Sequence, residues 1–156
     1  MANSAYLTKV VEPFIVEWVS QRIGVELKPK RLRVGPRTDG TVVHFDFDGV
    51  SEDGRTGLLV STSHTIKPGG TRKLHVDASI LLRADLDERL MAFVSDDVRQ
   101  NFVNKCDGLL ELSKIKMLIC DTLPADMQVG IAVFQEEAKS EVGSKGKKWK
   151  VGGRRQ

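Results

Sequence analysis

The chain has 156 residues, of which 40% are hydrophobic and 29% charged, as in an ordinary globular domain long enough to bury a core. The longest apolar runs, such as Met117–Cys120, are too short to cross a bilayer, and the first residues lack the pattern of a signal peptide. We therefore expect a cytoplasmic protein with no membrane partner. Cys106 and Cys120 have no partner ligands at short spacing, which excludes a recognisable metal or disulfide motif and predicts two buried thiols.

The net charge of +3 is unevenly distributed along the chain. Residues 143–156 contain six Lys or Arg and no acid, which leaves 18 basic against 21 acidic side chains in the remainder. A basic, glycine-rich end attached to a mildly acidic body indicates two parts with different roles. We predict a single α/β domain over residues 1–142 and a basic flexible tail over residues 143–156.

The apolar periodicity predicts a mixed sheet with helices on both faces. In chain order, the predicted elements are a helix that starts or kinks near Pro13 and ends near Gly24, a short strand near Leu32 and Val34, a hairpin with arms Thr41–Asp48 and Gly57–Thr65, a loop over 67–73, a helix over Leu74–Leu86, a strand over Arg89–Ser95, a helix through Val98, Phe102, Cys106 and Leu109, a strand over Ile115–Asp121, and a helix through Met127, Ile131 and Phe134. The last two strands flank a helix and should therefore be parallel. This N-terminal helix and hairpin, followed by helix–strand–helix–strand–helix, is an α/β sandwich.

The hairpin is the part of the chain that most suggests chemistry. Asp46 and Asp48 alternate with Phe45 and Phe47, so both carboxylates should lie on the face opposite the buried rings. Other motifs are missing: the three histidines form no HExxH pair, and no dinucleotide fingerprint or nucleophile elbow occurs.

This order of elements resembles the PD-(D/E)XK nuclease superfamily, the restriction-endonuclease-like fold. The resemblance covers roughly Thr8–Asp121 by pattern and Phe45–Thr65 at the level of residues. It implies that Asp48, with Asp46 as the alternative, holds Mg²⁺, and that Glu17 or Glu12 assists from the first helix. Hard oxygen ligands of this kind suit Mg²⁺, which activates water for phosphodiester hydrolysis.

The second arm departs from the family pattern. Where the resemblance requires Glu-x-Lys, the chain has Leu59-Val60-Ser61, and neutral hydroxyls do not replace a metal carboxylate. Lys73 or Lys67 is a candidate for a displaced lysine, whereas the missing acid has no evident substitute. We therefore expect a nucleic-acid-binding protein with a degenerate active site. The alternatives are an active Mg²⁺-dependent nuclease, a homodimeric interaction module, and a small-molecule pocket at Asp96 and Asp121.

Basic side chains occur in two groups that would suit nucleic-acid backbones. Positive charge attracts phosphates through counterion release, and an indole stacks on an exposed base. The predicted nucleic-acid-binding residues are Lys145, Lys147, Lys148, Trp149, Lys150, Arg154 and Arg155 in the tail, and Lys30, Arg31 and Arg33, with neighbouring Lys28, before the hairpin.

Overall fold

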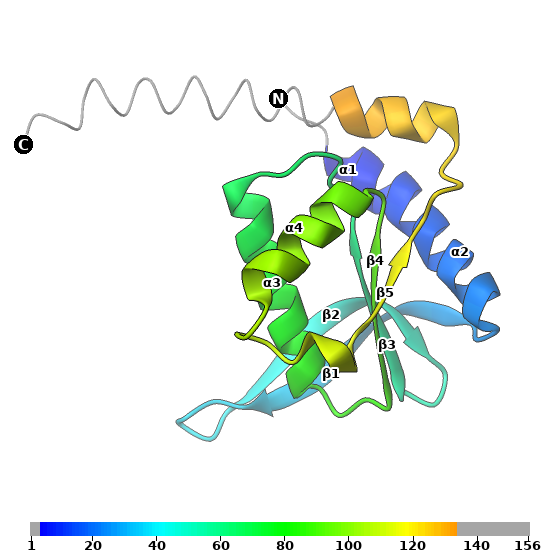
Figure 1. The fold of residues 1–156 in the computed structure, drawn as a ribbon. Coiled ribbons are helices and arrows are strands. Elements are labelled where there is room, and N and C mark those ends of the chain that lie inside the picture. Colours follow the sequence, from blue (N-terminus) through cyan, green and yellow to red (C-terminus); the bar gives the residue numbers. More distant parts are fainter. Residues whose placement is uncertain (1–3, 134–156) are drawn as a thin grey trace, which may run out of the picture.

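Five strands form one mixed sheet in the order β1-β2-β3-β4-β5 in the computed structural model, which describes residues 4–133 (Figure 1). The strands are β1 (Leu27–Pro36), β2 (Val42–Ser51), β3 (Thr56–Ser61), β4 (Glu88–Phe93) and β5 (Lys116–Ile119). The pairs β1–β2 and β2–β3 are antiparallel, whereas β3–β4 and β4–β5 are parallel. The predicted α/β class is confirmed, with two antiparallel and two parallel strand pairs in one sheet.

Helices cover both faces of this sheet. They are α1 (Ser4–Tyr6), the π-helical segment η1 (Leu7–Val11), α2 (Glu12–Ile23), α3 (Pro68–Arg83), α4 (Asp96–Cys106) and the 3-10 turn η2 (Leu112–Lys114), and residues 125–133 are also helical. Two apolar cores result: Leu81 and Phe102 of α3 and α4 pack on one face, and Ile15 of α2 packs with Ile131 on the other. Figure 1 shows α3 and α4 together on the side of the sheet away from α2. Among residues 4–133, no helix is both long and apolar enough to traverse a membrane.

The first helix changes from the π-helical η1 to α2 at Glu12, beside the proline where the sequence predicted a start or a kink. Pro13 has no backbone N–H, so it interrupts the regular helical ladder, and just before it the Glu12 N–H donates to the carbonyl of Leu7, five residues earlier. The helix ends as expected at Gly24, which adopts a left-handed φ of 73°. This geometry places Glu12 at the junction between η1 and α2.

Strand β1 is longer than predicted. The sequence indicated turns around a short strand, yet the strand spans ten residues and pairs with β2 along its length, with irregularities between Lys28 and Lys30 and between Arg33 and Gly35. β1 lies at the edge of the described sheet, which is the position where a strand tolerates proline. The basic residues of this segment therefore lie on a strand.

Helix α3 begins earlier than predicted, and this difference changes the site. The expected loop over 67–73 is wrong, because Pro68 occupies the first turn of α3 and the helix is already formed at Lys73. Proline is favoured there because its fixed φ suits the helix and its missing N–H has no intrahelical acceptor. Burial of Leu74 and Leu81 against the sheet then holds the segment in place. Lys73 and Asp77 consequently lie one helical turn apart.

Helix α4 is shorter than predicted. It ends at Cys106, and Leu109 lies beyond it with 69% of its surface exposed. The cap is Ser95, whose hydroxyl accepts from the Val98 N–H. Phe134 and the predicted tail over residues 143–156 lie outside the described residues.

Candidate active site

The two arms of the hairpin part next to Asp48. Strands β2 and β3 pair directly only at Gly49–Leu58 and Val50–Gly57. Beyond these pairs, the Asp48 Oδ2 accepts a hydrogen bond from the backbone N–H of Val60 at 2.7 Å. The side chain thus takes the place of a strand partner, and its burial raises the pKa of the Asp48 carboxyl.

Glu12 lies near Asp48 and shares its electrostatic environment. Burial, followed by the negative charge of Asp48, raises the pKa of Glu12 to about 7, against a smaller opposing effect of Lys73. The sequence favoured Glu17 for this role, but Glu17 is an exposed residue whose carboxylate accepts a hydrogen bond from Gln21. Glu12 is therefore the helix carboxylate that belongs with Asp48.

Helix α3 contributes an acid and a lysine. The Lys73 Nζ lies 2.9 Å from the Asp77 Oδ2, and the Asp77 side chain is only 6% exposed, against 68% for Lys73. Both charges act on Glu12 and on Asp48. Sequence reasoning missed Asp77, although one signal was present: an acid interrupts the apolar stripe of Leu74, Ala78 and Leu81. We call Glu12, Asp48 and Asp77 the carboxylate cluster.

A pocket of about 370 Å³ opens beside this cluster. It is lined by Thr8, Glu12, Pro13, Val16, Glu17, Leu27, Pro29, Asp46, Phe47 and Asp48. Three of the four predicted catalytic residues, Asp46, Asp48 and Glu17, therefore face one space, while Lys73 reaches the site through its charge from α3. The pocket lies between α2 and the hairpin.

Asp46 has a different environment from Asp48. It is exposed, and its carboxylate lies 3.0 Å from the Nε of Arg31 on the neighbouring strand. Arg33 lies opposite His44 in the same ladder, so Arg31 and Arg33 share the strand face that carries Asp46. By the same alternation Lys30 lies on the other face. The basic group before the hairpin is thus divided between two surfaces.

The donor atoms of the cluster suit a hard cation. Among the described residues, no three acidic, histidine or cysteine side chains lie close enough together to form a ready metal centre. Mg²⁺, however, commonly uses one or two carboxylates and completes its shell with water and substrate phosphate. Asp48 and Glu12 are two desolvated carboxylates whose charges repel each other. A cation between them would relieve that repulsion. The two residues therefore fit Mg²⁺ in the oxygen donors that they offer and in the number of carboxylates that this ion commonly uses.

The alternative site at the strand ends has a simpler structural explanation. Asp96 is exposed, and its carboxylate accepts from Arg99 and Gln100 within the first turns of α4. The hydrogen bond from Arg99 lowers the pKa of Asp96. Asp121 is exposed in the turn after β5. These contacts account for Asp96 without a ligand.

No family model matches the chain, and no curated protein or solved structure matches it significantly. What the chain does must therefore be inferred from its own residues.

Proposed function

We propose that the protein is a restriction-endonuclease-like enzyme that binds nucleic acid and hydrolyses phosphodiester bonds at the carboxylate cluster with Mg²⁺. The observation that carries this proposal is the placement of Lys73 and Asp77 on α3, where both charges act on Asp48. The expectation of a degenerate site depended on the missing acid and lysine of β3. We propose that Lys73 and the nearly buried Asp77, which both lie on the next element, take the place of those residues.

Each member of the site has a role that follows from its surroundings. Asp48 and Glu12 would hold Mg²⁺, which lowers the pKa of bound water and stabilises charge on the phosphate. Lys73 is largely exposed, so its ammonium is accessible to a phosphate oxygen beside the pocket. Asp77 fixes that lysine through a charge-assisted hydrogen bond of 2.9 Å and acts as a positioning residue.

Nucleic acid is the substrate class that the neighbouring surface favours. Arg31 and Arg33 continue the strand face that carries Asp46, so cations extend from the pocket along the hairpin. Phosphate contacts of this kind supply affinity and orientation without reading sequence. The predicted contribution of the tail, which includes Trp149, remains part of the proposal.

The proposal is tested by incubating the full chain with single-stranded and double-stranded DNA and RNA in MgCl₂ and in EDTA. We expect cleavage that requires the cation and falls about 100-fold or more in Asp48→Asn and Asp77→Asn. Asp96→Asn, an exposed acid on α4, is the matched control and should cleave like the unchanged protein. Cleavage that persists in EDTA or in Asp48→Asn would contradict the assignment.

A second candidate is nucleic-acid binding without hydrolysis. It is favoured by the buried Ser61 at the end of β3, where the family pattern requires a charged residue, and by the pairing of Lys73 with Asp77. It predicts salt-dependent binding in a filter or anisotropy assay and no products under any cation. Absence of both binding and cleavage would favour the interaction module instead.

A further inference from the structure

A second concavity lies between α3 and α4, on the face of the sheet opposite α2. It has a volume of about 450 Å³, and we call it the α3–α4 pocket. Its lining consists of Pro68, Thr71, Arg72, His75, Val76, Lys105 and Cys106. None of these side chains is acidic, which distinguishes this pocket from the carboxylate cluster.

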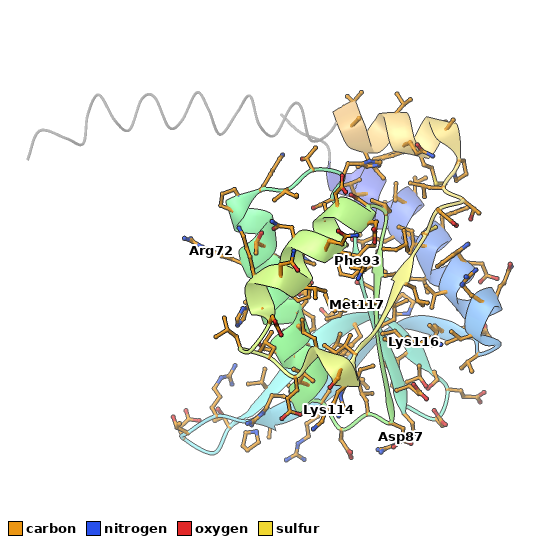
Figure 2. The ribbon with its side chains drawn as sticks, viewed as in Figure 1. Arg72, Asp87, Phe93, Lys114, Lys116 and Met117 are labelled. Atoms are coloured by element: carbon orange, nitrogen blue, oxygen red, sulfur yellow. The ribbon has the colours of Figure 1, made fainter. Side chains whose placement is uncertain are left out.

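Two cations approach the α3–α4 pocket from different helices. Arg72 belongs to α3 and Lys105 to the last turn of α4, and both are exposed. Within residues 4–133 neither has an ion-pair partner. Figure 2 shows Arg72 projecting outward from α3. Neither charge is neutralised by an ion pair within this part of the chain.

His75 adds a further donor to the lining. Its Nδ1 lies 3.6 Å from the Sγ of Cys106. Burial raises the pKa of the Cys106 thiol, which favours its protonated form. The donor and acceptor in this contact depend on the tautomer of His75, and the tautomer in which Nδ1 accepts from the thiol carries a hydrogen on Nε2.

The beginning of α3 adds further positive charge beside the pocket. The first turn of α3, which begins at Pro68, borders the pocket. The amino end of a helix of sixteen residues carries a partial positive charge. Guanidinium, ammonium and a helix terminus together are the donors that proteins use for phosphate.

We propose that the α3–α4 pocket binds a phosphate group. The space exceeds what a free phosphate fills, and the apolar surfaces of Pro68 and Val76 suit the organic part of a phosphate ester. The inference does not depend on hydrolysis at the carboxylate cluster. Within a nucleic-acid-binding protein, it supplies a second anchoring point for the chain of phosphates.

The test is an NMR titration of the ¹⁵N-labelled full chain carrying Asp48→Asn, in EDTA, so that cleavage at the proposed active site cannot affect the result. The probes are inorganic phosphate, a 5′-phosphorylated dinucleotide and the same dinucleotide without that phosphate. We expect saturable shifts of amides in the first turn of α3 and the last turn of α4. Arg72→Gln and Lys105→Gln should each weaken phosphate binding about tenfold.

The matched control is Lys116→Gln, an exposed lysine on β5 that lies away from this pocket (Figure 2). It removes the same charge and should leave phosphate binding unchanged. Tighter binding of the phosphorylated dinucleotide than of its counterpart identifies a terminal phosphate, and equal binding identifies a backbone phosphate. Absence of saturable binding, or equal weakening by all three Gln variants, would overturn the proposal.

Discussion

The carboxylate of Asp48 accepts a hydrogen bond from the backbone N–H of Val60 at 2.7 Å, at the point where β2 and β3 separate. One side chain thus closes a gap in the hydrogen-bonding of the sheet and borders the pocket beside Glu12. A residue that serves both the fold and the site can be tested with two substitutions that separate these roles.

Asp48→Asn and Asp48→Ala should differ in stability while both lose the proposed activity. The amide oxygen of Asn can still accept from Val60, whereas Ala leaves that buried N–H without its acceptor. We expect Ala to lower the free energy of unfolding by about 1–3 kcal/mol and Asn to change it by less than about 1 kcal/mol. Urea denaturation measures both values. Equal destabilisation would show that the contact with Val60 contributes little to the fold.

Glu12 predicts a specific dependence of stability on pH. Its pKa in the folded chain is about 7 against an ordinary value of 4.5, so the folded state binds the proton more tightly. The free energy of unfolding should therefore fall as pH rises from about 4.5 to about 7. Glu12→Gln should remove this decline and stabilise the protein at pH 8 by on the order of 1 kcal/mol, after allowance for solvent screening.

The control for this experiment is Glu17→Gln, an exposed acid on the same helix. It should leave the decline in place. Urea denaturation between pH 4 and 8 at constant ionic strength measures the slope. A slope that Glu12→Gln does not alter would remove Glu12 from the cluster.

Mg²⁺ should stabilise the folded chain through the same carboxylates. A ligand that binds only the folded state adds RT ln(1 + [L]/Kd) to stability, or about 2.7 kcal/mol at a hundredfold excess over Kd. We expect a rise in Tm with MgCl₂ at pH 8 that NaCl of equal ionic strength does not reproduce. Asp48→Asn should abolish this rise. An identical rise in that variant would place the cation elsewhere.

The sequence predicted the half of the site that lies on elements with a clear period. Asp46 and Asp48 were predictable because alternation with Phe45 and Phe47 assigns the two acids to one strand face. Both acids line the pocket. Local pattern did not distinguish Glu12 from Glu17, since either position is compatible with a helix. The difference arises from which carboxylate the tertiary fold desolvates beside Asp48.

The other half of the site was hidden by the start of α3. Two adjacent glycines after Pro68 indicated a loop. The packing of Leu74 and Leu81 on the sheet outweighs the weak helix propensity of these glycines. With the loop assumed, Lys73 had no fixed geometry and Asp77 no connection to it. Their pairing depends on helix geometry and on long-range packing, which local patterns do not specify.

The pair of Lys73 and Asp77 should respond asymmetrically to the loss of either partner. Asp77 is nearly buried and Lys73 is exposed, so Lys73→Met leaves a desolvated carboxylate without its cation, whereas Asp77→Asn leaves a lysine in water. We expect Lys73→Met to lower the free energy of unfolding by about 1–3 kcal/mol and Asp77→Asn by less. In the double variant, Asp77→Asn should recover most of the loss caused by Lys73→Met, because the unpaired charge is gone.

Lys73→Met should also steepen the decline of stability with pH, since the Lys73 charge lowers the pKa of Glu12. Urea denaturation of the four proteins, with Lys116→Met as an exposed control, measures the cycle. Additive losses would mean that the two side chains do not interact in solution, and α3 would then no longer provide a fixed lysine to the site.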